Sequence, residues 1–277
     1  MPKTVELKHF RIAETKVDPE RVRAWLDHLG AYEFDPFEGQ YTENHTPDSA
    51  LLIALAAKRC YMSFEVGLNP NVTKVRSEWV DYFDNILKSG HGSVLEHAVF
   101  SFAIEGVSRV FTGEMNRHRA GWAISEGSMR FIRFDKDISF WMPTSIQDQP
   151  GDSDSLKDRK AASRDVFMAA FKQTEELYSQ LLDIWDMTDG DHDFAYKKKV
   201  TSCLRRIVPM GVATGGVWTG NVRALRHVLA MRCSPAAEEE IAEVFTGIAR
   251  ELVKDFPLMF GDFSEENGYF APKYPKV

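Results

Sequence analysis

The pattern of apolar and polar residues along the chain predicts several helices joined by a few short strands. Helix-forming residues and apolar side chains at helical spacing occupy the segments 49–62, 71–88, 106–119, 155–187, 193–208, 221–231 and 235–255. Asn71 is a candidate N-cap for the second of these helices. Pro209 ends the fifth helix, and Pro235 suits the first turn of the last.

Alternating apolar and polar residues predict strands between these helices. The segment 98–105 (AVFSFAIE) alternates, and 130–134 (RFIRF) is a short run of two arginines and three apolar residues that we also predict to be a strand. A third strand, 212–220, is interrupted by glycines, whereas 36–49 and 143–155 are polar loops at the surface. Several helices around a small mixed or antiparallel sheet indicate an α+β fold rather than a doubly wound one.

The composition is that of an ordinary globular protein. The 277 residues are 44% hydrophobic and 27% charged, with a net charge of −7, which excludes a disordered or disulfide-scaffold protein. We expect a single domain over residues 49–277, preceded by an N-terminal extension of undetermined role, residues 1–48. Because no apolar run approaches the ~18 residues of a membrane span and no signal-peptide core is present, we expect a cytoplasmic protein that does not bind a membrane.

The sequence does not predict a metal site. Cys60, Cys203 and Cys233 are too widely spaced for a zinc knuckle and odd in number for a disulfide framework, so we expect reduced thiols. His91 and His97 are six residues apart and belong to no HExxH pattern, which leaves them as structural histidines or as residues lining a ligand pocket.

The arginines of the chain are unevenly distributed. Ten of the eighteen lie in the windows 109–133 and 205–232, which contain no lysine and, as acidic residues, only Glu114 and Glu126. Arginine without lysine indicates forked hydrogen bonds to an anion rather than general solubility. The alternative is buried arginines in interface ion pairs. Nucleic acid is not an expected partner, because the windows lack interleaved aromatic residues and the chain is acidic overall.

Two strings within these windows are candidates for ligand binding. Arg117-His118-Arg119 is followed by Ser128 and Arg130, and a hydroxyl and a guanidinium two residues apart on an extended segment can hold a phosphate or carboxylate. The alternative is a solvated helix end with a charged turn.

The second string begins with Asn221, a candidate N-cap, and continues with Arg223, Arg226 and His227, which share one face of a helix. Its alternative is a basic stripe that pairs with the acidic residues 238–240.

Together these segments resemble flavin-dependent thymidylate synthases. The resemblance is carried by GHGSVLEHAVFSF (90–102), GVSRV, the triplet Arg-His-Arg followed by serine and arginine, WTGNVRALRHVLAMR (218–232) and AAEEEI, in that order. It covers about residues 50 to 260. It implies an α+β fold that assembles as a homotetramer, with active sites shared between subunits.

The resemblance also implies an activity. The family binds FAD, reduces it with NADPH, takes a one-carbon unit from methylenetetrahydrofolate and converts dUMP to dTMP. Hydride passes from the reduced flavin to the nucleotide, and no enzyme cysteine attacks the pyrimidine. This agrees with the lack of a nucleophile motif around the three cysteines of this chain.

Roles for individual residues follow from the same resemblance. The implied flavin contacts are His91, Ser93, Arg117, His118, Arg119, Glu126, Asn221, Arg223 and His227. The implied nucleotide contacts are Glu114, Arg117, Glu126, Gly127, Ser128, Met129, Arg130, Arg205 and Arg232, of which Ser128 and Arg232 are the implied catalytic residues. A guanidinium beside the uracil ring, the role implied for Arg232, stabilises negative charge that develops on the ring.

Three features depart from the family pattern, all on the nucleotide side. Eight residues rather than seven separate the triplet from Ser128, Glu114 stands where the family has glutamine, and Phe131 stands where tyrosine is common. Two alternatives to thymidylate synthesis therefore stay open. One is a related C5 methylase or hydroxymethylase that acts on UMP or another uridylate, and the other is a flavin- or nucleotide-binding protein without turnover.

Overall fold

The computed structural model describes residues 1–38, 46–76 and 78–277. Its centre is a four-stranded antiparallel sheet in the order β2-β3-β6-β4. The four strands are β2 (Lys8–Glu14), β3 (Val99–Ser108), β6 (Ala213–Asn221) and β4 (Trp122–Glu126). Phe102 lies opposite Trp218, which in turn lies opposite Ile124, so these three side chains share one face of the sheet.

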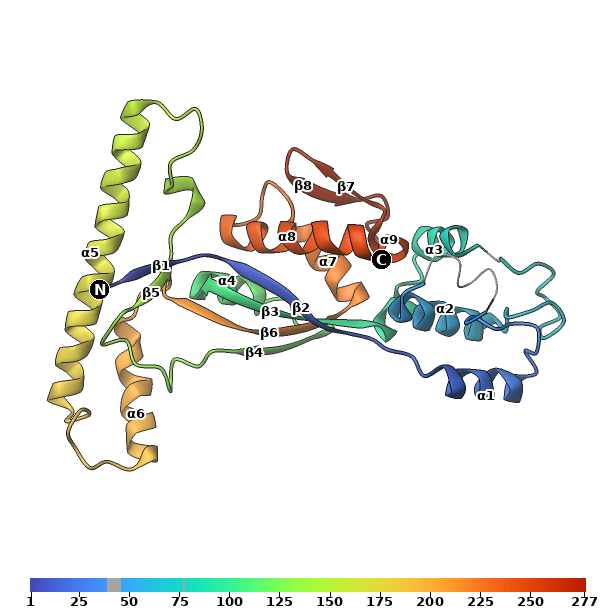
Figure 1. Cartoon of the computed structure of the whole chain (residues 1–277), viewed down its shortest axis with the longest axis horizontal. Helices are drawn as coiled ribbons and strands as arrows, with labels where there is room; N and C mark the ends of the chain where they lie inside the picture. The colour runs from blue at the N-terminus through green and yellow to red at the C-terminus, as the bar shows by residue number, and fades with distance from the viewer. Residues whose placement is uncertain (39–45, 77) are drawn as a thin grey trace.

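Three helices pack on that face of the sheet (Figure 1). They are α4 (Arg109–Met115), which continues from β3, α7 (Val222–Arg232), which continues from β6, and α8 (Glu239–Asp255). Phe111 bridges the layers, with its ring 5.6 Å from Trp218 on the sheet and 6.3 Å from Phe245 on α8. On the opposite face Phe10 and Ile12 of β2 are more than half exposed.

The remaining elements extend from the two ends of the sheet and from α8 (Figure 1). At one end lie α1 (Pro19–Leu29), α2 (Asp48–Tyr61), α3 (Trp79–Lys88) and the 3₁₀ helix η2 (Gly92–His97). At the other end lie α5 (Asp154–Ile184), α6 (Phe194–Leu204), the 3₁₀ helix η4 (Arg205–Ile207) and the parallel pair β1 (Lys3–Val5) and β5 (Ser139–Trp141). After α8 the chain forms α9 (Pro257–Phe260) and the hairpin of β7 (Phe263–Glu266) and β8 (Tyr269–Pro272).

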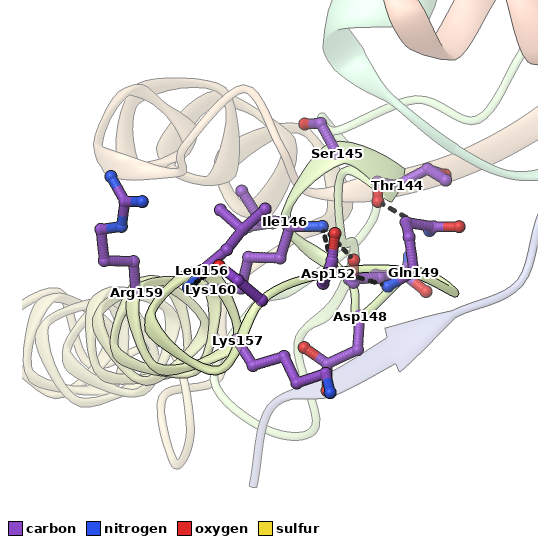
Figure 2. Close-up of polar contacts among 12 residues, drawn as sticks. Thr144, Ser145, Ile146, Asp148, Gln149, Asp152, Leu156, Lys157, Arg159 and Lys160 are labelled. Atoms are coloured by element: carbon purple, nitrogen blue, oxygen red, sulfur yellow. Dashed lines mark hydrogen bonds and ion pairs between the residues drawn. The ribbon is translucent and has the colours of Figure 1, made fainter.

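The polar loop 143–155 lies between α5 and α8 and is tied to both. It contains the 3₁₀ helix η3 (Thr144–Ile146). Lys160 of α5 is buried, and its ammonium lies 2.6 Å from the Asp152 carboxylate; both residues are drawn in Figure 2. On the other side, the Thr144 hydroxyl donates to Glu243 of α8 at 2.9 Å. The predicted surface loop is thus fixed at two points.

The structure confirms the α+β class and several of the predicted elements. The helix predicted over 49–62 is α2, and the long helix predicted over 155–187 is α5. The strands predicted at 98–105 and 212–220 are the two central strands of the sheet. The prediction for 36–49 falls in part on residues 39–45, which lie outside the described residues.

Two helices are shorter at their N-terminal ends than predicted. The helix predicted to begin at Asn71 begins at Trp79, because β-branched Val72, Thr73 and Val75 disfavour a helix and the buried ammonium of Lys58 holds the carbonyl of Arg76 at 3.4 Å. The last helix begins at Glu239 rather than near Pro235, and the Glu238 carboxylate caps it by accepting from two backbone N–H groups.

Other segments differ in type from the prediction. The helix predicted over 106–119 covers only 109–115, since Gly106 (φ +72°) and the residues up to Ser108 continue β3. The segment 130–134 is a turn and not a strand, and the sheet takes its edge strand from 122–126 instead. The segment 92–97 forms the 3₁₀ helix η2, which leads into β3.

Candidate active site

A buried carboxylate fixes the start of α4, the helix that leads into the Arg-His-Arg triplet. The Ser108 hydroxyl caps α4 by accepting from the backbone N–H groups of Val110 and Phe111. Glu240 of α8 accepts from both the backbone N–H and the hydroxyl of Ser108. Burial raises the pKa of Glu240 to about 7, against the lowering effect of these hydrogen bonds. The position of α4 on the sheet therefore depends on a contact between residues 132 positions apart.

The triplet forms the turn after α4, and its three side chains separate. His118 is buried, at 8% exposure, while Arg117 and Arg119 are exposed. Among the described residues, neither of these two guanidinium groups donates a hydrogen bond to another side chain or forms an ion pair. Both are thus placed to bind an anion that arrives from solvent.

Arg232, at the end of α7, lies against this turn. Its Nε donates to Nε2 of His118 at 2.8 Å, and its Nη1 lies 2.9 Å from Oε2 of Glu114. The ring of His227, five residues earlier on α7, lies 6.0 Å from that of His118 in an edge-to-face arrangement. All four are predicted site residues: His118 and His227 as flavin contacts, Glu114 and Arg232 as nucleotide contacts. We refer to Glu114, His118, His227 and Arg232 as the Arg232 cluster.

The imidazole of His118 is neutral in this cluster. Burial, together with the positive charge of Arg232 and the neighbouring His227, lowers the pKa of His118 to about 4, and Glu114 opposes this only in part. Because Nε2 accepts a hydrogen bond from Arg232, the ring proton is on Nδ1. Arg232 therefore meets a carboxylate and a neutral ring rather than a second cation.

The turn after β4 contains the expected nucleotide residues and is held by an arginine that the sequence did not single out. Arg109, at the start of α4, lies 3.3 Å from the Glu126 carboxylate and donates to the carbonyl of Gly127. The N–H of Gly127 donates to Gly215 of β6 at 2.9 Å. One oxygen of Glu126 and Nε of Arg109 are buried without a hydrogen-bond partner among the described residues. Arg109 lies in the lysine-free window 109–133, but its spacing does not distinguish it from the other arginines of that window.

The rest of this turn reaches α6. Arg130 donates from Nε to the Ser202 hydroxyl at 3.0 Å, and its backbone N–H donates to the Ser128 hydroxyl at 3.4 Å. Met129 lies between them and packs against the apolar cluster under α5. Arg205, in η4, is close enough to Arg109 to lower the pKa of that guanidinium, although burial is the larger cause. Arg130 therefore lies within this turn, and Arg109 and Arg205 lie near each other beside it.

A second group of expected residues lines a pocket of about 350 Å³ between α7 and the C-terminal segment. Its walls include Glu96, Gly121, Asn221, Arg223 and His227, together with residues 275–277. Arg223 forms an ion pair with Glu96 at 2.6 Å, and Asn221 caps α7 through a hydrogen bond from Ala224 N. Gly121 (φ +75°) is required here, because a Cβ at this position would lie 2.7 Å from the Asn221 amide nitrogen.

Not every expected flavin contact lies in this pocket. His91 stacks on Tyr61 with ring centroids 5.6 Å apart and lines a different cavity, of about 690 Å³, beside α2 and α3. Ser93 is exposed in η2. The neighbouring Gly92 packs against Arg223 of the smaller pocket, since a Cβ at this position would lie 2.7 Å from Nε of Arg223. Arg226, expected beside Arg223, is instead buried in a two-pronged ion pair with Asp262 at 2.6 Å and 2.9 Å.

Comparisons with known proteins point to one family of enzymes. A family model described as "thymidylate synthase complementing protein" matches residues 43–258. A flavin-dependent thymidylate synthase of Mycobacteroides abscessus is 33% identical over 76% of this chain and 78% of its own length. Another, of Corynebacterium glutamicum, is 28% identical over 89% of this chain and 92% of its own length.

Two solved structures share the fold. The UMP/dUMP methylase PolB from Streptomyces cacaoi, bound with 5-Br UMP, superposes with a TM-score of 0.61 at 16% identity, covering 94% of this chain and 95% of the other. Thymidylate synthase X from Helicobacter pylori, with FAD and dUMP, superposes with a TM-score of 0.52 at 20% identity, covering 79% and 95%. With a family model over most of its length and relatives above 30% identity, the chain belongs to the flavin-dependent thymidylate synthase family.

Proposed function

We propose that this chain converts dUMP to dTMP, with methylenetetrahydrofolate as carbon donor and NADPH-reduced FAD as hydride source. The observation that carries the proposal is the contact between the 350 Å³ pocket and the Arg232 cluster. His227 lines the pocket, and its ring packs against His118, which accepts the hydrogen bond of Arg232. A flavin site and an electrophilic arginine are therefore adjacent.

The pocket residues suit a flavin. The pocket is large enough for part of FAD, and its walls combine a guanidinium, an imidazole and an amide with backbone that Gly121 keeps open. Asn221, Arg223 and His227 would hold FAD, with Arg117 and Arg119 at its phosphates. Bound FAD supplies hydride transfer from NADPH to the nucleotide. Lys276 adds an ammonium to the same wall, from a segment beyond the region that the family model matches.

α4 sets the spacing of the nucleotide contacts. Arg109 at its start holds the turn 126–130, and Glu114 near its end holds Arg232. Five residues of helix rise about 7.5 Å, a distance that a mononucleotide can span. Arg130 and Arg205 would bind the phosphate at one end, and Arg232 would face the uracil at the other. There its guanidinium stabilises the negative charge that develops on the ring during attack by C5.

The cysteines do not supply a nucleophile in this arrangement. Cys233 follows Arg232 but is fully buried, and burial raises the pKa of its thiol to about 12. A thiol that stays protonated is a poor nucleophile. Cys60 lies on α2, and Cys203 lies at the solvent-exposed side of α6. A route through hydride transfer, with no cysteine adduct, fits these positions.

A homotetramer is part of the proposal and is supported by two exposed apolar surfaces. Phe10 and Ile12 project from the sheet face opposite α8, and Val166, Leu177 and Ile184 are exposed along α5. Single exposed apolar residues are common, but such stripes on ordered elements are typical of interfaces. If Arg119 and Arg232 of one site come from different subunits, a mixture of the inactive Arg119→Ala and Arg232→Ala proteins will recover activity on reassembly. No recovery means that one subunit supplies both.

The test is the visible spectrum of bound flavin under anaerobic conditions. NADPH is added without nucleotide, with dUMP, or with UMP, and dTMP is then measured after methylenetetrahydrofolate is supplied. Faster bleaching with dUMP and formation of dTMP support the proposal. Faster bleaching with UMP favours the uridylate methylase instead, an alternative that Glu114 in place of glutamine keeps open. Protein that binds no FAD contradicts both.

A further inference from the structure

The guanidinium of Arg232 is held at two of its three nitrogens before any ligand is present. Nε donates to His118 at 2.8 Å and Nη1 contacts Glu114 at 2.9 Å. Both partners come from the end of α4 and the turn after it, whereas Arg232 ends α7. The side chain of Arg232 is only 13% exposed, so the rest of the protein also restricts its rotation. Nη2, with two N–H groups, donates no hydrogen bond to the protein among the described residues.

The two partners have different effects on Arg232. Neutral His118 orients the guanidinium but leaves its charge in place. Glu114 orients it and also cancels one unit of positive charge near the site where a dianionic nucleotide would bind. The orientation favours catalysis, because a preformed donor needs no reorganisation when charge develops on the substrate. The cancelled charge weakens nucleotide binding.

We propose that Glu114 is a positioning residue, which with His118 fixes Arg232 so that its Nη2 edge is available to the pyrimidine. The proposal rests on the function proposed above. It replaces the expectation that Glu114 contacts the nucleotide itself. A carboxylate has both a hydrogen-bond acceptor and a negative charge, whereas an amide has the acceptor without the charge. The two properties of Glu114 can therefore be tested separately.

Two variants separate these properties. Glu114→Gln keeps an acceptor oxygen at the same reach and removes the charge, and Glu114→Ala removes both. We expect Glu114→Gln to keep kcat within about threefold and to lower the KM for dUMP, because the net charge of the site rises by one. We expect Glu114→Ala to lower kcat by tenfold or more, since a misplaced catalytic group costs up to about 10²-fold. Calorimetry of dUMP binding without reductant should show tighter binding to both variants.

The opposite pattern overturns the proposal. If Glu114→Ala keeps the wild-type kcat, the position of Arg232 does not depend on Glu114. If Glu114→Gln loses as much kcat as Glu114→Ala, the carboxylate itself takes part in the chemistry and is not a positioning group. Retained FAD binding and an unchanged thermal unfolding midpoint confirm that each variant is folded.

A second readout does not depend on turnover. The groups that face His118 are Glu114 and Arg232, with His227 packed beside them, so its titration reports the cluster. In protein with ¹³C-labelled histidine, with the His118 signal identified by its loss in His118→Asn, Arg232→Met should raise the pKa of His118 towards 6.5, its ordinary value. An unchanged pKa overturns the geometry. If the pKa moves but wild-type protein makes no dTMP, the proposed function fails and the cluster stands.

Discussion

The buried carboxylate of Glu240 gives the structure a specific dependence on pH. It is fully buried and accepts two hydrogen bonds from Ser108, which begins α4. Replacing it by glutamine keeps the side-chain size and an acceptor oxygen for the Ser108 N–H, but removes the ionisable group. The variant Glu240→Gln therefore isolates the effect of charging this position.

The direction in which stability changes with pH follows from the raised pKa of Glu240. In the folded protein the pKa of Glu240 is about 7, against 4.5 as its ordinary value. The folded state thus binds the proton more tightly than the unfolded state. The stability contributed by protonated Glu240 is complete below pH 4.5 and is lost as pH rises through 7. At about 1.4 kcal/mol per pKa unit, the loss is about 3 kcal/mol.

The assay is urea unfolding followed by tryptophan fluorescence between pH 4.5 and 8.5. We expect the free energy of unfolding of the wild type, relative to Glu240→Gln, to fall by about 3 kcal/mol across this range, because other titrating groups cancel in the difference. Glu243→Gln, an exposed carboxylate on the same helix, is the control and should follow the wild type. Parallel curves for wild type and Glu240→Gln would refute the reasoning.

Three further predictions concern the site. Arg109→Lys should raise the KM for dUMP about tenfold in steady-state assays and leave the FAD Kd unchanged, because an ammonium cannot hold both Glu126 and the Gly127 carbonyl as the guanidinium fork does. Gly121→Ala should cost about 1–2 kcal/mol in denaturant unfolding and weaken FAD binding in fluorescence titrations, since φ is +75° and the new Cβ meets Asn221. Cys233→Ala should keep kcat within about threefold, and complete loss of activity in protein that still binds FAD would contradict the assignment of Cys233 as a buried structural thiol.

Local sequence determined much of the frame of this protein. The long apolar repeat of α5, the alternation in β3 and the Asn cap of α7 are short-range signals, because period and capping act within one or two turns. The lysine-free arginine windows and the Arg-His-Arg triplet likewise indicated an anion site. What these signals did not contain was the partner of each arginine.

Those partners were decided by tertiary structure. Arg226 and Arg223 are three residues apart on one helix, yet one is buried against Asp262 and the other lines a pocket with Glu96. His118 and Arg232 lie 114 positions apart, and their contact exists only because α4 and α7 pack on the same sheet. A hydrogen bond or ion pair depends on the distance between two groups in space, and residue type alone does not specify which groups come together. The sequence therefore determined which chemical groups this site contains, and the packing of the helices on the sheet decided which of them meet.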